Sequence, residues 1–333
     1  MFPLILFLYA SRKSYKRNES LKMNNIIKKH AYLIIADRNQ EQLKLLVGLL
    51  DSSKNDIFIL IDSKSNEIDK NLSIYTKFSK VTFLDRIPIY WGSYSQVQAQ
   101  LNLIKESIFG EYYYYHYLSG LDLPLCSQEV IHNFFEKNEN KIFITFSKDV
   151  DKKSLNNRTK KYFGTKYFRS HQTLTSKIKK FFFHKVNKLS VMVTKSRLKD
   201  RYLGFGSNWV SLNHSFALKL LKNEEWIYQK FNNGFLVDEL FMPSVIIKEK
   251  LEDTIYYNVS MINKETEFQG NLRYINWWDG TPYVWKLKDY ETLKKARLHG
   301  HLFSRKFDNK IDDKIISKVI EELIPLDNNK GEN

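Results

Sequence analysis

The hydrophobic pattern is clearest in residues 81–125, where it predicts a strand followed by a helix. Residues 81–84 form a short apolar run, as expected for a buried strand. Apolar residues then recur at spacings of four, three and four, which places them on one helical face: Val97, Leu101, Ile104 and Ile108. Ser93 or Ser95 is in position to cap the start of this helix.

A second apolar run, residues 112–118, follows the helix and stops at Ser119 and Gly120. Strand, helix and strand with short connections predict a βαβ unit, whose crossover favours parallel strands. Polar residues follow both strands, at residues 91–95 and 119–122. Because ligands bind outside the carboxyl ends of strands in an open parallel sheet, this region is predicted to form one wall of a small-molecule site.

The remaining apolar pattern extends this alternation along the chain. The predicted strands cover residues 30–37, 57–62, 141–146 and 272–278. The predicted helices cover residues 40–50, 131–136, 216–221, 237–248, 289–297 and 315–323. Residues 203–213 predict a glycine-broken turn leading into a strand that carries Trp209. Strands alternating with helices indicate an α/β fold with a central, mostly parallel sheet flanked by helices.

Asp62 ends the second predicted strand and is followed by Ser63 and Lys64. A carboxylate at this place in an α/β domain commonly binds a ribose hydroxyl, and an aspartate that only caps the loop is equally common. The sequence contains no G-x-G-x-x-G and no P-loop motif, which argues against dinucleotide enzymes and P-loop kinases.

Six segments occur in the order of one enzyme family and together cover residues 30–308. They are W-G-S-Y-S-Q-V-Q-A-Q-L-N-L-I, Y-L-S-G-L-D-L-P-L, G-S-N-W-V-S-L-N, V-D-E-L-F, L-R-Y-I-N-W and L-F-S-R-K-F-D. This set resembles the core-2/I-branching β-1,6-N-acetylglucosaminyltransferases and the related peptide O-xylosyltransferases. The Lys-, Asn- and Ile-rich composition suggests a bacterial-type member.

The resemblance implies a GT-A-like nucleotide-sugar transferase fold, a UDP-sugar donor and an inverting reaction. The family pattern P-D-E-x-F is similar to V-D-E-L-F, with Val237 in place of proline, and implies that Glu239 is the catalytic base. The alternative is that Asp238 and Glu239 only interact favourably with the positive end of a helix dipole.

The resemblance also assigns binding roles. Nucleotide contacts are implied for Asp62, Trp91, Arg273 and Lys306. Substrate contacts are implied for Ser119, Asp122, Ser207, Trp209 and Asp238. Trp209 could equally be a core residue. In the resembled enzymes an arginine and a lysine at the last two motifs replace a metal ion on the diphosphate, so no cofactor and no metal is expected.

Composition limits the class of protein and its partners. The chain has 333 residues and a net charge of +16, which suggests an anionic partner. The single cysteine, Cys126, rules out an intramolecular disulfide and favours a reducing compartment, unlike the disulfide-bonded secreted members of the family. Residues 1–10 are apolar but too short to span a bilayer. Residues 1–23 are therefore either a weak anchor or the product of a start codon assigned too early.

Most of the net positive charge lies between Lys148 and Arg201. This segment contains 17 Lys and Arg residues and only three acidic residues, which gives it a net charge of +14. Aromatic residues are interleaved with these bases. Such a segment can bind nucleic acid, lie on an anionic membrane, or form a solvated acceptor-side insertion. We favour the membrane surface, because a lipid-linked anionic acceptor fits the implied reaction. No nucleic-acid motif accompanies the charge.

Asp149 and Asp151 form an Asp-x-Asp motif, which many nucleotide-sugar transferases use to hold Mg²⁺ or Mn²⁺. Lysines flank it on both sides, three-residue patterns recur by chance, and the resembled enzymes are metal-independent. We therefore do not assign a metal site to it.

These observations predict one glycosyltransferase domain over residues 24–325. It would comprise a nucleotide-binding half (24–148), a basic insertion (149–202) and an acceptor half with the base (203–325), followed by a tail (326–333). The predicted reaction is transfer of N-acetylglucosamine from its UDP donor to a glycan or lipid-linked glycan hydroxyl, in surface polysaccharide synthesis. The predicted location is the cytoplasm, at the membrane surface. The alternatives are a UDP-xylose-dependent enzyme, and a basic membrane- or nucleic-acid-binding module without catalysis.

Overall fold

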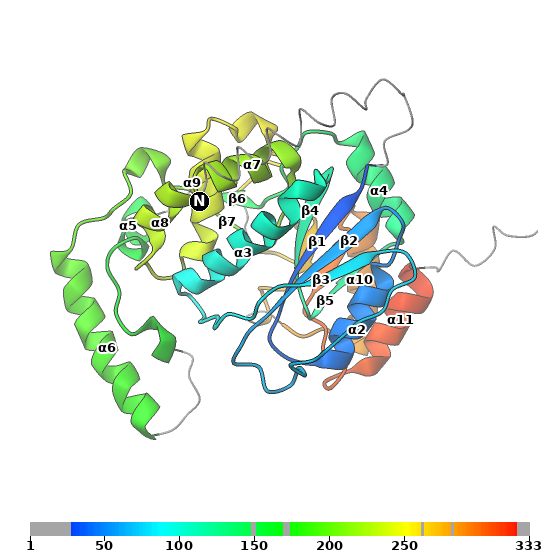
Figure 1. Ribbon diagram of the computed structural model, residues 1–333, viewed down its shortest axis with the longest axis horizontal. Helices are drawn as coiled ribbons and strands as arrows, with labels where there is room; N and C mark the ends of the chain where they lie inside the picture. Colours follow the sequence, from blue (N-terminus) through cyan, green and yellow to red (C-terminus); the bar gives the residue numbers. More distant parts are fainter. Residues whose placement is uncertain (1–27, 148–150, 169–173, 261–262, 281–282, 325–333) are drawn as a thin grey trace, which may run out of the picture.

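A five-stranded sheet with the order β3-β2-β1-β4-β8 runs through the middle of the molecule (Figure 1). The computed structural model describes residues 28–147, 151–168, 174–260, 263–280 and 283–324. The strands of this sheet are β1 (His30–Ala36), β2 (Asn55–Ile61), β3 (Lys80–Phe83), β4 (Tyr114–Ser119) and β8 (Ser211–Asn213). All neighbouring pairs are parallel except β4 with β8, which confirms the predicted mostly parallel sheet.

Side chains alternate between the two faces of the sheet, and each face is covered by a different set of helices. Leu33 packs into the core on the side of α3 (Tyr94–Ser107), α7 (His214–Lys222) and α9 (Phe241–Lys248). Its neighbour Tyr32 packs into the core on the other side, with α2 (Gln40–Leu49) and α4 (Gln128–Lys137). Apolar strands buried on both faces are typical of a parallel sheet between two helical layers.

Side-chain caps fix the first residues of the two helices that follow β1 and β3. Ser93 caps α3, where its side chain accepts a hydrogen bond from the Ser95 amide, so the structure selects one of the two predicted caps. Asn39 caps α2 from a left-handed conformation with φ 57°, and its side chain accepts from the Gln42 amide. Asn39 follows the end of β1 by three residues, whereas Ser93 follows the end of β3 by ten.

A smaller sheet, β5-β10-β9, follows directly from the large one. Its strands are β5 (Asp122–Pro124), β10 (Phe303–Arg305) and β9 (Arg273–Ile275). β5 begins three residues after the end of β4 and pairs antiparallel with β10, so that Arg305 lies opposite Asp122. The helices α10 (Tyr290–Leu298) and α11 (Asp313–Leu323) pack their apolar residues on this sheet in a third core cluster.

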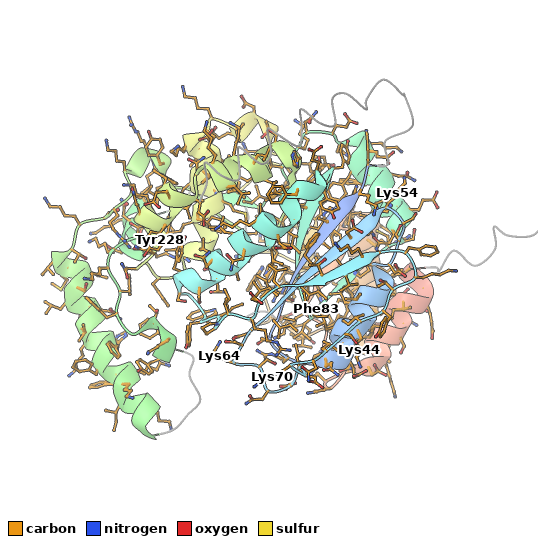
Figure 2. All side chains as sticks on the ribbon, viewed as in Figure 1. Lys44, Lys54, Lys64, Lys70, Phe83 and Tyr228 are labelled. Atoms are coloured by element: carbon orange, nitrogen blue, oxygen red, sulfur yellow. The ribbon has the colours of Figure 1, made fainter. Side chains whose placement is uncertain are left out.

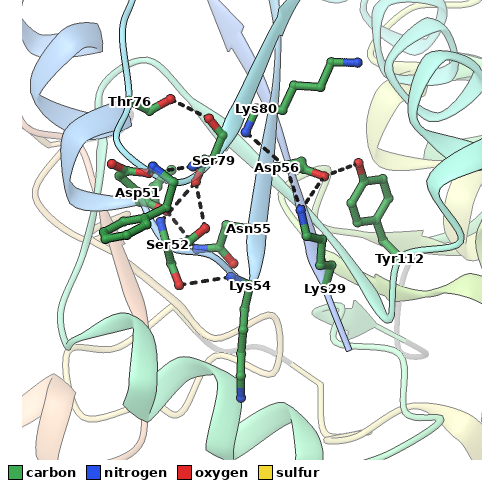
Figure 3. Close-up of polar contacts among 12 residues, drawn as sticks. Lys29, Asp51, Ser52, Lys54, Asn55, Asp56, Thr76, Ser79, Lys80 and Tyr112 are labelled. Atoms are coloured by element: carbon green, nitrogen blue, oxygen red, sulfur yellow. Dashed lines mark hydrogen bonds and ion pairs between the residues drawn. The ribbon is translucent and has the colours of Figure 1, made fainter. Parts of the chain in front are cut away.

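Two carboxylates, Asp51 and Asp56, hold the amino ends of β2 and β3 together (Figure 3). Asp51 accepts hydrogen bonds from the backbone amides of residues 77–79, at 2.6–3.0 Å. Asp56 accepts from the Tyr112 hydroxyl at 2.7 Å and from the Lys80 amide at 3.1 Å. These bonds connect the beginning of β3 to β2, so the two carboxylates at the amino ends of these strands have a structural role.

The basic segment forms mainly helical structure that the sequence pattern did not predict. It contains α5 (Lys152–Arg158), η2 (Thr165–Tyr167) and α6 (Leu174–Val193). Helix α6 lies at the far left of Figure 1, separated from the central sheet. The remaining elements are η1 (Ile108–Gly110), β6 (Phe146–Ser147), η3 (Asp200–Tyr202), β7 (Phe205–Gly206), α8 (Glu224–Phe231), η4 (Val237–Glu239), η5 (Glu252–Thr254) and η6 (Leu287–Asp289).

Several predicted elements differ from the structure in extent. Residues 141–146 form bridges and only the two-residue strand β6, because this stretch pairs briefly with several partners. The strand predicted over residues 272–278 is limited to β9. Trp209 lies before β8 and not on a strand. The acids predicted in the first turn of one helix occupy a separate 3-10 turn, η4, ahead of α9.

Candidate functional site

The carboxyl ends of β1, β2 and β4 lie side by side at one edge of the sheet. The Asp62 amide donates to the Ala36 carbonyl at 2.8 Å, and the Gly120 amide donates to the Ile35 carbonyl at 3.0 Å. Figure 2 shows Lys54, which precedes β2, and Lys64, which follows it, at opposite ends of the strands. This arrangement is the one the sequence predicted, and it brings the residues after three strands to one place.

Asp62 holds its own loop in place. Its Oδ1 accepts hydrogen bonds from the amides of Lys64 (3.0 Å) and Ile89 (3.2 Å), and its Oδ2 pairs with the Lys64 ammonium. Asp62 therefore stabilises its own loop, and whether it also contacts a nucleotide stays a prediction. A ribose hydroxyl could reach this carboxylate only in competition with Lys64.

Ser119 and Asp122 form a closed turn between β4 and β5. The Ser119 amide donates to Oδ2 of Asp122 at 3.1 Å, and the Ser119 hydroxyl donates to Oδ1. Asp122 is completely buried, and its Oδ1 lies 3.7 Å from Nε of Arg305. The carboxylate therefore organises the turn and faces a cation, and it does not itself lie open to a substrate.

Arg305 is the residue at this edge that the sequence interpretation overlooked, although it precedes Lys306 in the same motif. Its guanidinium lies 4.4 Å from the centre of the Trp209 ring, and its side chain is 12% exposed. Within the described residues, its buried Nε and Nη1 have no hydrogen-bond partner. Burial lowers the pKa of Arg305, against the opposing charge of Asp122. Buried guanidinium groups whose N–H donors lack hydrogen-bond partners are suited to an anionic ligand.

Lys306 adds a second cation to the first. Burial lowers the pKa of Lys306, and the nearby charges of Arg38 and Arg305 lower it further. Asp37 and Asp308 act in the opposite direction. In the part of the chain that the structure describes, the Lys306 ammonium makes no hydrogen bond or ion pair. The two adjacent side chains therefore concentrate positive charge at the carboxyl end of β10.

The structure corrects the prediction for Arg273. Its side chain is completely buried, and its guanidinium donates to the Ser211 hydroxyl at 2.7 Å and to the Val210 carbonyl at 2.9 Å. It also donates to the carbonyls of Asn271 and Tyr117. Burial lowers the pKa of Arg273 to about 9. These bonds join the two sheets from inside, so this side chain does not contact a diphosphate.

The Trp91 loop packs against the loop that precedes Glu239. The rings of Trp91 and Phe235 meet edge to face at 5.5 Å, and the Leu236 amide donates to the Gly92 carbonyl at 2.7 Å. Gly92 has φ +71°, and an added Cβ would lie 2.6 Å from the Phe235 ring. Glycine is therefore required here. The indole of Trp91 remains 37% exposed, as a ligand-binding ring must be.

Glu239 is held by an arginine from the basic segment. Its Oε2 accepts from Nη2 of Arg158, which also donates to the Leu236 carbonyl at 2.7 Å. The Glu239 side chain is 36% exposed, so the carboxylate is fixed yet accessible. Arg158 gave no signal in the sequence, because it is one of many bases in its segment.

Asp238 connects the acidic turn to Trp209. Its Oδ2 accepts from the Asn208 amide group at 2.8 Å, while its buried Oδ1 has no partner among the described residues. Burial, followed by the charge of Glu239, raises the pKa of Asp238 to about 6. Since Asn208 precedes Trp209, contacts run from the acidic turn through residues 208 and 209 to Arg305.

Ser207 has a structural role in the same loop. Its hydroxyl accepts from the Thr145 amide at 3.1 Å and donates to the Trp209 carbonyl at 3.3 Å. The hydroxyl thus both accepts and donates a hydrogen bond within the protein, and the predicted contact between Ser207 and the substrate gains no support. The Trp209 ring is the member of this loop that faces a site cation.

The Asp-x-Asp motif lies partly outside the described residues, since these include Asp151 but not Asp149. Asp151 caps α5 by accepting from the Lys153 amide at 3.0 Å. Among the residues with a described position, no group of three or more histidine, cysteine and carboxylate side chains could hold a metal ion.

A cavity of about 330 Å³ lies away from these residues. It is lined at the beginning of β4 and around α7 by Glu111, Tyr112, Tyr113, Tyr114, Asn140, Asn213, His214 and Ser215. Its position at the amino end of β4 separates it from the edge that carries Ser119. The candidate site is therefore defined by side-chain chemistry at the carboxyl edge.

Comparison with known proteins identifies a matching family. The family model described as Core-2/I-Branching enzyme matches residues 30–298, which is most of the chain. The matched region contains β1 to α10 and therefore both the large sheet and the Glu239 turn. No curated protein matches the sequence.

Proposed function

This chain belongs to the Core-2/I-branching enzyme family, and we propose that it transfers N-acetylglucosamine from UDP-N-acetylglucosamine to a hydroxyl of a glycan. The family consists of inverting glycosyltransferases with a GT-A-like fold, so the chain is a glycosyltransferase, as the sequence predicted. The proposal concerns the donor, the acceptor and the residues that act.

The observation that carries the proposal is the continuous set of contacts between a held carboxylate and a cationic edge. Arg158 fixes Glu239, Asp238 bonds to Asn208, and the next residue, Trp209, stacks under Arg305. An inverting transferase needs a base for the acceptor and positive charge for the leaving group. The contacts link one group of each kind through three neighbouring loops.

In the proposed reaction, Glu239 removes the proton from the acceptor hydroxyl. The acceptor oxygen attacks C1 of the sugar on the face opposite UDP, and the C1–O bond to the diphosphate breaks. The electron pair of that bond passes to the β-phosphate of UDP. Arg305 and Lys306 then balance the negative charge that develops there, in place of the Arg273 contact expected from the sequence.

Contacts to the nucleoside are proposed for Asp62 and Trp91. Trp91 offers an exposed ring beside the Glu239 loop, and Asp62 lies at the same sheet edge. We propose no metal requirement, because two side-chain cations supply the charge that a divalent ion otherwise would. UDP-xylose remains the alternative donor, since both branches of the resemblance share these motifs.

The setting proposed for the reaction is surface polysaccharide synthesis at the cytoplasmic face of a membrane. The single cysteine, buried as a free thiol, supports a reducing compartment. The basic segment supports an anionic membrane surface as a partner.

A donor screen tests the function directly. Purified protein is incubated with UDP-N-acetylglucosamine, UDP-xylose or UDP-glucose, and released UDP is measured with and without oligosaccharide acceptors. We expect UDP release to be fastest with UDP-N-acetylglucosamine and to be lost in Glu239→Gln. Fastest release from UDP-xylose would establish the alternative donor, and no release from any donor would count against the proposal.

A further inference from the structure

Helix α6 combines an exposed apolar face with a basic composition. Seventeen large apolar side chains are exposed in the described parts of the chain, and six of them lie on this one helix. They are 59–75% exposed: Ile178, Phe181, Phe182, Leu189, Met192 and Val193. Residues 174–193 contain no acidic side chain. A concentration of this kind on one element marks an interaction surface.

The opposite face of α6 fixes the helix to the protein. Asn187 makes two hydrogen bonds with the backbone of Phe163, at 2.7 and 2.9 Å, and the Ser190 hydroxyl donates to the Lys161 carbonyl at 2.7 Å. The Phe183 ring stacks on Tyr167, with centroids 5.4 Å apart. These contacts hold the helix in one rotation about its axis.

Helical geometry shows that the apolar face points away from these anchors. At about 100° per residue, Ile178 and Asn187 are nine residues apart and point in opposite directions. Phe182 and Leu189 lie within about 40° of Ile178 on the same count. The held face and the exposed face are thus on opposite sides, and Figure 1 shows α6 on the periphery.

Lysines border the apolar face. By the same count Lys177 and Lys188 lie on one flank and Lys179 on the other. Lys185 lies within the face, with its ammonium 4.6 Å from the centre of the Phe181 ring. Long basic side chains beside a buried apolar stripe can extend their charges to lipid headgroups.

We propose that α6 lies in the interface of an anionic lipid bilayer, with Ile178, Phe182 and Leu189 inserted below the headgroups. The charge fits this occupant, because the flanking cations would meet anionic headgroups while the stripe meets acyl chains. Among the described residues, none of the helices qualifies as a membrane-spanning segment. A helix with one apolar face and basic flanks lies in the plane of the membrane surface. This inference deepens the proposed membrane association and does not depend on the donor sugar.

The test compares sedimentation with vesicles of phosphatidylcholine alone and of phosphatidylcholine mixed with phosphatidylglycerol. We expect the triple variant Ile178→Ser, Phe182→Ser, Leu189→Ser to bind the mixed vesicles at least tenfold more weakly than wild type, since each lost side chain removes buried apolar area. Lys177→Gln and Lys188→Gln should each cost about fivefold on the same vesicles. Leu298→Ser, which removes an apolar side chain 73% exposed on α10, should bind like wild type.

A second measurement separates insertion from adsorption by charge. Phe182→Trp places a fluorophore on the stripe, and we expect its added emission to be quenched by lipids brominated in the acyl chains. Absence of this quenching, or equal vesicle binding by the triple variant and wild type, would overturn the proposal. So would self-association abolished by the triple variant without any change in vesicle binding, because the face would then bind a second copy of the chain.

Release of UDP without vesicles keeps this result separate from the enzymatic proposal. The triple variant should release UDP at the wild-type rate, because α6 carries none of the proposed site residues. If the protein binds vesicles as described but releases no UDP from any donor, the bilayer contact is supported and only the enzymatic proposal is refuted.

Discussion

The guanidinium of Arg305 lies 4.4 Å from the centre of the Trp209 ring, which joins the two halves of the candidate site. Arg305 reaches this position from β10, where it also faces Asp122, while Trp209 comes from the loop bonded to Asp238. A ring under a cation leaves the edges of the guanidinium open to an anion. In the proposed reaction, this pair is the point at which the diphosphate and the acceptor meet.

Glu239→Gln should lower kcat by about 10²–10⁴-fold, because an amide cannot remove the acceptor proton. The change keeps the size of the side chain and one oxygen for Arg158, so the fold and UDP affinity should be retained. Steady-state transfer and calorimetric UDP binding measure the two effects. Turnover equal to wild type would show that Glu239 has only a structural role.

Arg305→Gln and Arg273→Gln should have different effects, although each removes one arginine. Arg305→Gln should weaken UDP binding or turnover by roughly 10²-fold, with a small change in stability. Arg273→Gln should instead lower the free energy of unfolding by roughly 3 kcal/mol or more, since it leaves buried carbonyls without donors. Urea unfolding and UDP titration of both variants check this, and loss of UDP binding by a stable Arg273→Gln protein would restore the original prediction.

The sequence was sufficient for the sheet but not for the details of the site. The apolar runs of β1, β2 and β4 are local signals and were predicted correctly, and the cap of α3 is one of the two serines predicted. The roles of Arg273 and Arg305 depend on burial, which is set by the pairing of β10 with β9 on one side and with β5 on the other. Neither arginine carries a local signal of whether it is enclosed. Arg158 was hidden for another reason, since it stands among many similar bases.

Asp238 should make the stability of the protein fall as pH rises. Its pKa is about 6 in the folded protein and near 3.8 when exposed, so between these values the folded state holds the proton more tightly than the unfolded state. Unfolding is therefore favoured increasingly from pH 4 to above 6. Asp238→Asn should remove this cost and raise stability by roughly 3 kcal/mol at pH 8 but little at pH 4. Melting curves across this range test it, with the exposed Asp253→Asn as control; parallel curves for wild type and Asp238→Asn would contradict it.

Lys306 should give UDP binding a dependence on alkaline pH. Burial and neighbouring cations lower the pKa of Lys306, so its charge is lost at a lower pH than that of an ordinary lysine. UDP affinity should fall as pH rises through that value. Lys306→Arg should bind UDP without this fall, because arginine stays charged, and Lys306→Ala should bind weakly at every pH. Titration calorimetry between pH 7 and 10 would decide, and a wild-type affinity independent of pH would argue against contact between Lys306 and the diphosphate.

Activity should persist when divalent metal is removed. A departing diphosphate needs compensating positive charge, and Arg305 and Lys306 are the two cations proposed to provide it at the carboxyl end of β10. If they do, excess EDTA leaves transfer within about twofold of the untreated rate, and added Mn²⁺ changes it little. The alternative assigns the charge to a metal held by Asp149 and Asp151. That arrangement predicts activity that vanishes with EDTA, returns with Mn²⁺, and is lost in Asp151→Asn. Because Asp151 also caps α5, a melting curve of Asp151→Asn must accompany the assay. Loss of activity in a folded Asp151→Asn protein, together with rescue by Mn²⁺, would transfer the role of the two cations to a metal ion.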